Sequence, residues 1–204
     1  YCIIAGNISH DIPTIIKTLS ILSRYYQGVF YTLGALEYQG VDNVYAKTKQ
    51  LLQACSRIKN VAVLHQNVVI IDGVAILGAN GWFGNTVPAD PDTEEKLDVY
   101  RYEDLAYLKN SIEKLQKHLD VKKIVMVTNS IPSTDLYYGE VPDFVQNLMP
   151  MDLILFADTE KKVSHWAFGT HAKIVDATMH GVNYFNNPKL GKNPYWAKRI
   201  EVNV

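Results

Sequence analysis

The chain has 204 residues, of which 48% are hydrophobic and 20% are charged. A chain of this size and composition can fill one hydrophobic core without disulfides or structural metals. Its 20 basic and 21 acidic residues leave a net charge of -1. This balance argues against a dedicated nucleic-acid or membrane-surface binder, because such proteins depend on an excess of Lys and Arg.

The two cysteines, Cys2 and Cys55, are expected to be buried free thiols. Free thiols fit a reducing compartment, so we expect a cytoplasmic protein. No apolar stretch approaches the roughly 20 residues that a membrane-crossing helix needs, and no secretory signal opens the chain. The sequence begins at Tyr1, without a methionine and already inside an apolar run. Whether further residues precede Tyr1 is therefore an open question.

Strand-like and helix-like segments alternate in the first part of the chain. Asp11 followed by Pro13 is typical of a helix start, and apolar residues recur on one helical face as far as Leu22. Asp72-Gly73 between two apolar runs is typical of a two-residue hairpin turn. The elements predicted here are, in chain order, strand 1–5, helix 12–22, strand 29–33, helix 44–58 and the hairpin strands 68–71 and 74–77.

A loop rich in Gly, Asn, Pro and Asp follows, from residue 78 to about residue 92. Apolar residues spaced three or four apart from Leu105 to Leu119 then predict the clearest helix of the sequence. A single α/β domain covering residues 1–204 is the simplest interpretation of the whole pattern. The remaining predicted elements are strand 124–127, helix 144–160 and strands 163–168, 173–177, 183–185 and 199–204.

Four of the predicted strands end in similar polar turns. In open α/β sheets, binding and catalytic sites gather at the carboxyl ends of strands, where turns deliver side chains and backbone amides to one crevice. Any site of this chain is therefore predicted at the turns Gly6-Asn7, 34–37, 128–130 and 169–171.

At these turns the sequence resembles the calcineurin-like metallophosphoesterases, in particular their small single-domain bacterial and phage members. Residues 1–8 (YCIIAGNI) are similar to the family's strand ending in Gly-Asp, and residues 29–37 (VFYTLGALE) to its strand ending in Gly-Asn-His-Glu. Residues 125–133 (VMVTNSIPS) are similar to the strand leading into Thr-His-His-x-Pro-Ser, and residues 165–172 (HWAFGTHA) to Trp-x-x-Gly-His-Thr-His. The resemblance implies a four-layer α/β/β/α sandwich with a two-metal site at one edge.

The departures from the family pattern fall on the positions that carry its chemistry. Asn7 stands where the family has an Asp that bridges both metal ions, and Leu36 stands where a His protonates the leaving group. The family's first motif, Asp-x-His, would lie upstream of Tyr1. The other metal-ligand positions carry Ala35, Asn129, Thr170 and Ala172. Closely spaced divalent ions need charged or imidazole ligands, so we expect no metal, no cofactor and no catalytic residue here.

The residues left at the turns allow two interpretations each. Asn7, Asn129 and Thr170 either form a neutral polar pocket for a small ligand or satisfy one another and the local backbone. Glu37 either orients a neighbour in that pocket or is an ordinary carboxylate at the surface or behind the pocket. His171 is either a relocated metal ligand or a histidine of a turn.

The leading hypothesis is a pseudoenzyme: a phosphoesterase-like domain that serves as a binding or structural module, with a protein as its partner and with no nucleic acid or membrane. Exposed aromatic residues at Tyr137-Tyr138 and Tyr195-Trp196 would be contact points for that partner, unless they pack in the core. The alternative is a residual phosphodiesterase or phosphatase with a reduced or relocated site for Mn, Zn or Fe. A third hypothesis is metal-free binding of a small ligand in the vacated pocket.

Overall fold

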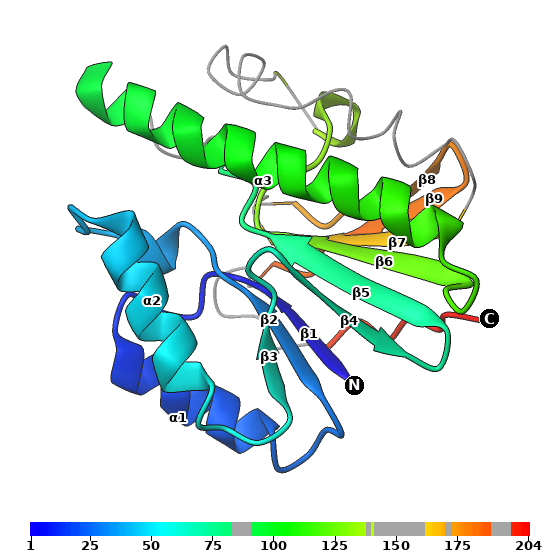
Figure 1. Cartoon of the computed structure of the whole chain (residues 1–204), viewed down its shortest axis with the longest axis horizontal. Coiled ribbons are helices and arrows are strands. Elements are labelled where there is room, and N and C mark those ends of the chain that lie inside the picture. Colours follow the sequence, from blue (N-terminus) through cyan, green and yellow to red (C-terminus); the bar gives the residue numbers. More distant parts are fainter. Residues whose placement is uncertain (83–90, 138–139, 141–161, 170–172, 189–196) are drawn as a thin grey trace.

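The computed structural model describes residues 1–82, 91–137, 140, 162–169, 173–188 and 197–204, with only the backbone of residues 91–98. Two β-sheets face each other and helices cover their outer faces (Figure 1). The elements are β1 (Cys2–Ala5), α1 (Ile12–Leu22), β2 (Val29–Thr32), the 3-10 helix η1 (Leu36–Tyr38), α2 (Val44–Cys55), β3 (Val61–Val63), β4 (Asn67–Ile71), β5 (Val74–Ala79), α3 (Pro91–Lys117), β6 (Lys123–Thr128), η2 (Thr134–Leu136), β7 (Val163–Phe168), β8 (Asp176–Met179) and β9 (Val182–Phe185).

The smaller sheet has the parallel order β1-β2-β3 and is covered on its outer face by α1 and α2. The Asp11 carboxylate begins α1 by accepting a hydrogen bond of 2.9 Å from the backbone N–H of Thr14. Asn43 begins α2 in the same way. Side-chain caps of this kind satisfy N–H groups that have no partner inside the helix. The apolar faces of both helices pack on the sheet. The buried residues Ile15 and Leu19 of α1 and Leu51 and Cys55 of α2 lie in one cluster with Tyr31 of β2.

The larger sheet has the order β4-β5-β6-β7-β9-β8. Its inner pairs from β5 to β9 are parallel, whereas the hairpins β4–β5 and β8–β9 at its two edges are antiparallel. Helix α3 packs on the outer face, where Leu108 and Ile112 are fully buried in the same cluster as Trp166. The hairpin predicted around Asp72-Gly73 is confirmed.

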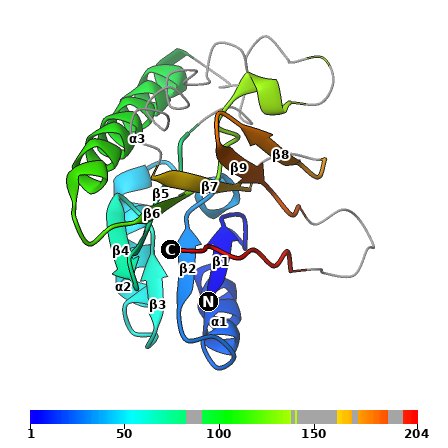
Figure 2. The ribbon, with the colours of Figure 1, turned by 90° about the vertical axis from the view of Figure 1, so that its right-hand side faces the viewer.

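A third apolar cluster lies between the two sheets. Phe30 of β2 and Leu64 pack there against Ile76, Val125 and Val127 of the larger sheet. The layers are therefore helix, sheet, sheet and helix, as Figure 2 shows from the side. This confirms the α/β/β/α sandwich that the resemblance implies, and it brings the carboxyl ends of β1, β2, β6 and β7 to one edge.

Several predicted boundaries are wrong. Helix α3 begins at Pro91, well before Leu105, and Leu119 lies beyond its end and is 85% exposed. Residues 199–204 form no strand, although Val202 packs against the cluster between the sheets. The predicted helix 144–160 lies outside the described residues. The short strand β3 has no counterpart among the predicted strands.

Both cysteines are free thiols, as predicted, but only Cys55 is buried, whereas Cys2 is half-buried. Cys55 is 1% exposed, and burial raises the pKa of its thiol to about 11. In the part of the chain that the structure describes, no helix is both long and apolar enough to cross a membrane.

Candidate functional site

The predicted turns lie against one another at the edge where the strands end. An ideal Cβ placed on Gly6 would lie 2.8 Å from the Cα of Gly34 and 2.6 Å from Nδ2 of Asn129. A Cβ on Gly169 would lie 1.9 Å from the carbonyl oxygen of Ala5. Real Cβ atoms do not come this close to other heavy atoms. The turns can therefore meet only because residues 6, 34 and 169 are glycines. The sequence correctly predicts that these turns gather at one edge.

Glu37 is the organising residue of this edge. Its side chain is fully buried, and its Oε2 accepts hydrogen bonds from the backbone N–H groups of Asn7 (2.9 Å) and Gly34 (2.7 Å). Its Oε1 accepts from Ile8 (2.6 Å) and, at a longer 3.4 Å, from Ser9. The carboxylate therefore fastens the turn after β1 to the turn after β2. The interpretation of Glu37 as a surface carboxylate is wrong.

The charge of Glu37 also affects the core beneath it. Tyr31 of β2 is fully buried. Burial, and then the negative charge of the Glu37 carboxylate, raise the pKa of Tyr31 far above its ordinary value. Both effects favour the neutral hydroxyl of Tyr31 over its phenolate.

Asn129 and Asn7 bind backbone rather than each other. Asn129 is 1% exposed, its Nδ2 donates to the carbonyl of Ala5 (2.7 Å), and its Oδ1 accepts from the N–H of Ala35 (3.1 Å). Asn7 has the left-handed φ of 62° that Asn tolerates, and its exposed side chain accepts from the N–H of Leu36 (3.0 Å). Both amides thus hydrogen-bond to the backbone of neighbouring turns.

A two-metal centre does not fit the residues that the structure describes at this edge. The neutral amide oxygens of Asn7 and Asn129 and both oxygens of Glu37 already accept backbone hydrogen bonds. Ala35 and Leu36 supply no side-chain donor, and divalent ions are held by carboxylate or imidazole ligands. Among the described residues, no group of three or more His, Cys, Asp or Glu side chains is placed to hold a metal. Thr170, His171 and Ala172 lie outside the described residues.

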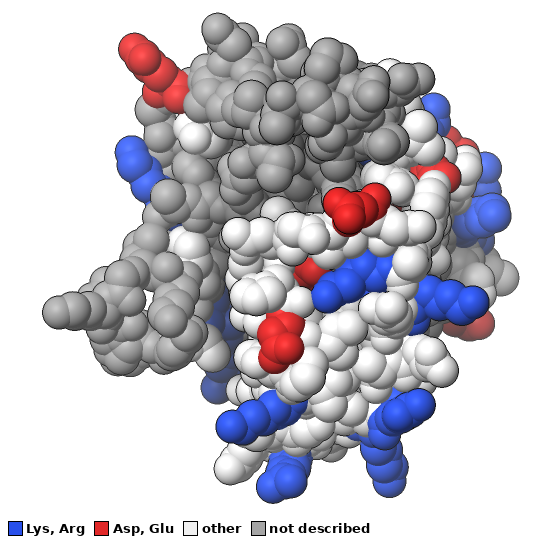
Figure 3. Space-filling view, turned by 90° about the vertical axis from the view of Figure 1, so that its left-hand side faces the viewer, with Lys and Arg blue, Asp and Glu red and all other residues white. Residues whose placement is uncertain are grey.

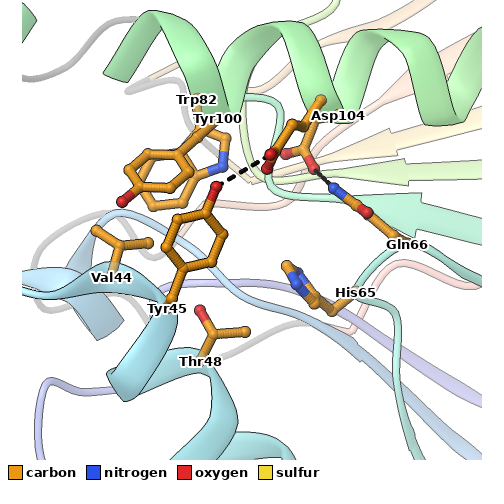
Figure 4. A pocket seen from close by; sticks show the side chains of 9 residues that line it. Val44, Tyr45, Thr48, His65, Gln66, Trp82, Tyr100 and Asp104 are labelled. Carbon is orange, nitrogen blue, oxygen red and sulfur yellow. Dashed lines mark hydrogen bonds between the residues drawn. The ribbon is translucent and has the colours of Figure 1, made fainter. Parts of the chain in front are cut away.

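Beside this edge lies a cavity of about 80 Å³ between α2 and α3, which the sequence does not predict (Figure 4). Tyr38 connects the two places, because it follows Glu37 and its ring lies 4.8 Å from that of Trp82. The Tyr38 hydroxyl is 2.7 Å from the Thr48 hydroxyl at the base of the cavity. The lining residues come from distant parts of the sequence: Val44, Tyr45, Thr48, His65, Gln66, Trp82, Tyr100, Glu103 and Asp104.

Of the predicted aromatic contact points, only Tyr137 lies within the described residues. Tyr137 packs against the core of the larger sheet, and Tyr138, Tyr195 and Trp196 lie outside the described residues. Among the described residues, four tyrosine rings are exposed: Tyr1 (59%), Tyr25 (79%), Tyr45 of α2 (56%) and Tyr102 of α3 (72%). Basic and acidic side chains are interspersed on the face shown in Figure 3, in keeping with the net charge of -1.

Comparison with solved structures places this architecture among known folds. A phosphopantetheinyl hydrolase from Mycobacterium tuberculosis aligns with 95% of this chain and 82% of its own, with a TM-score of 0.64 and 13% identity. GAP50 of Plasmodium aligns with 90% of this chain but 57% of its own, with a TM-score of 0.54 and 13% identity. No protein-family model matches the sequence, and no curated protein sequence is significantly similar to it. The chain therefore has a metallophosphoesterase-type α/β fold.

Proposed function

We propose that this chain is a catalytically inactive phosphoesterase-like domain that serves as a binding or structural module for a protein partner. One observation carries the proposal: the polar residues at the strand ends hold the backbone together instead of offering ligands. Glu37, Asn7 and Asn129 each accept hydrogen bonds from main-chain N–H groups of neighbouring turns. The scaffold of the edge is thus kept while its metal-binding chemistry is replaced.

The two structural neighbours bear on the two functions that this fold allows. One is described as a phosphopantetheinyl hydrolase, which is the reason to keep a residual hydrolase as the alternative. GAP50 is described as the anchor in the inner membrane complex of Plasmodium, and an anchoring role for a domain of this fold supports a non-catalytic module. The exposed rings of Tyr45 and Tyr102 support a protein contact, because aromatic side chains bury a large area at little entropic cost. The free thiols Cys2 and Cys55 support a reducing, cytoplasmic location.

We expect no turnover of bis-p-nitrophenyl phosphate by the protein in the presence of Mn²⁺ or Zn²⁺. The physical reason is that neither ion finds the anionic ligands needed to activate water and stabilise the developing charge. The measurement is release of p-nitrophenol, compared between the native chain and Asn7→Ala. Asn67→Ala, an exposed position at the start of β4, is the matched control. Metal-dependent release that Asn7→Ala abolishes and Asn67→Ala preserves would establish the residual hydrolase instead.

A further inference from the structure

Trp82 is held in an unusual backbone conformation at the wall of the cavity between α2 and α3. Its φ is 47°, a left-handed value that is rare for a bulky side chain and costs free energy unless the surroundings enforce it. The surroundings do so on both sides of the residue. Asn80 Oδ1 accepts from the N–H of Trp82 (3.0 Å), and the Nε of Arg101 donates to its carbonyl (3.2 Å). Strain of this kind is retained where the position of the side chain matters.

The strained backbone places the indole of Trp82 in a row of aromatic rings. Its ring lies 4.8 Å from that of Tyr38 and 5.2 Å from that of Tyr100, and Tyr45 meets Tyr100 edge-on at 4.9 Å. Figure 4 shows Tyr45 and His65 on opposite sides of the cavity, with Asp104 of α3 above them. One wall of the cavity is thus built from aromatic rings, which attract cations through their electron-rich faces.

A cation site also needs a negative charge that no Lys or Arg neutralises, and within the described residues Asp104 supplies one. This residue is 1% exposed and accepts hydrogen bonds from the N–H of Gly81 (2.9 Å) and from Nε2 of Gln66 (3.1 Å). A carboxylate has about four acceptor positions, so two such bonds leave capacity for another donor. Among the described side chains, no Lys or Arg forms an ion pair with it. Burial raises the pKa of Asp104, whereas its hydrogen bonds from Gly81 and Gln66 and the nearby His65 act in the opposite direction.

The two other described ionisable side chains that line the cavity besides its tyrosines, Glu103 and His65, leave it with a negative character. Glu103 adds a second carboxylate, which accepts a hydrogen bond from the Tyr45 hydroxyl at 3.0 Å. The basic group that lines the cavity is His65, and burial lowers the pKa of its imidazole, so it is largely uncharged near pH 7. No Lys or Arg is among the described residues that line the cavity. The cavity therefore combines aromatic walls with uncompensated carboxylates.

We infer that the cavity between α2 and α3 binds the ammonium group of an alkylamine, with the aromatic rings of Tyr45, Tyr100 and Trp82 and the carboxylates of Glu103 and Asp104 as its ligands. A volume of about 80 Å³ admits a primary ammonium on a narrow alkyl chain. The same chemistry is supplied by a free amine or by a lysine side chain of another protein. The inference goes beyond the proposed function, since it holds whether or not the strand ends bind metal.

The test is a titration followed by the NMR signal of the Trp82 indole N–H, with butylammonium and Nα-acetyl-lysine methylamide as probes. The neutral analogues butanol and Nα-acetyl-norleucine methylamide are the controls. We expect saturable shifts with both cations, at a dissociation constant on the order of 1 mM for such a partly exposed site, and none with the neutral analogues. Tighter binding of the lysine derivative would assign the site to a protein side chain. Equal or tighter binding of butylammonium would assign it to a free amine.

Two variants separate the parts of the site. Glu103→Gln removes one charge and Tyr45→Ala removes one ring, and each is expected to weaken binding about three- to fivefold. Glu113→Gln on the same helix and Tyr25→Ala, both exposed, are the matched controls and should bind as the native chain does. Equal shifts with the neutral analogues, or no saturable shift with either cation, would overturn the inference. Neither result bears on the phosphodiesterase assay, which reports on the strand ends.

Discussion

Replacing Glu37 with Gln is expected to lower the free energy of unfolding by about 3–5 kcal/mol. The carboxylate accepts backbone hydrogen bonds through both oxygens, so every acceptor position faces a donor. A glutamine amide turns its NH₂ group toward two of these N–H groups and leaves them buried without partners. Each unsatisfied group costs about 1–3 kcal/mol, more when the lost partner was charged.

Urea unfolding followed by far-UV circular dichroism measures this effect. Glu113→Gln is the control, because Glu113 is exposed on α3 and surface changes of this kind stay within about 0.5 kcal/mol. Glu37→Asp keeps the charge on a shorter side chain and should fall between the native chain and Glu37→Gln. If the free energy of unfolding of Glu37→Gln lies within about 1 kcal/mol of that of the native chain, the carboxylate does not fasten the two turns.

The second large effect is expected at Gly169, where β7 ends against β1. A Cβ at this position would lie 1.9 Å from the carbonyl oxygen of Ala5 and 2.8 Å from Nδ2 of Asn129. The first of these neighbours is backbone and cannot swing aside, so the two sheets would have to separate at this edge. We expect Gly169→Ala to lower the free energy of unfolding by about 3 kcal/mol or more, the upper range for overpacking.

Gly28→Ala is the matched control for this change. A Cβ at Gly28 would approach only the ring atoms of Tyr1 and Phe30, at 3.1 Å and 3.2 Å. Such side chains can shift, so a loss below about 1 kcal/mol is expected there. The two variants are compared by thermal and urea unfolding. Equal stability of Gly169→Ala and Gly28→Ala would show that the strand ends are not packed as closely as described.

The sequence predicts most of the sandwich because its strands carry strong local patterns. The Asp72-Gly73 turn between apolar runs and the Asp11 cap of α1 act on their nearest neighbours, and both are confirmed. The start of α3 is missed because the apolar spacing that marks the helix begins only at Leu105. Residues 199–204 alternate as a strand does, but they have no strand pairing in the structure, and Arg199 and Glu201 pair with each other at the surface. Local pattern cannot supply a missing strand partner.

The sequence likewise predicts one part of the candidate site and misses another. The turns are predicted because Gly6, Gly34 and Gly169 mark strand ends in the sequence. The role of Glu37 is not predicted, since its partners in the turn after β1 lie about 30 residues away and are backbone groups without a sequence signature. The aromatic cavity is missed for a related reason. Tyr45, His65 and Trp82 come together only when α2 and α3 pack beside each other, so no local pattern in the sequence marks them as one site.

The most direct measurement is the metal content of the purified chain after equilibration with Mn²⁺ or Zn²⁺ and removal of excess ions, determined by elemental mass spectrometry. Neutral amides and a carboxylate that already binds backbone N–H groups predict far less than one ion per chain, unchanged by Asn7→Ala. Two ions per chain in the native protein, lost in Asn7→Ala but kept in Asn67→Ala, would contradict the proposal that these strand ends bind no metal.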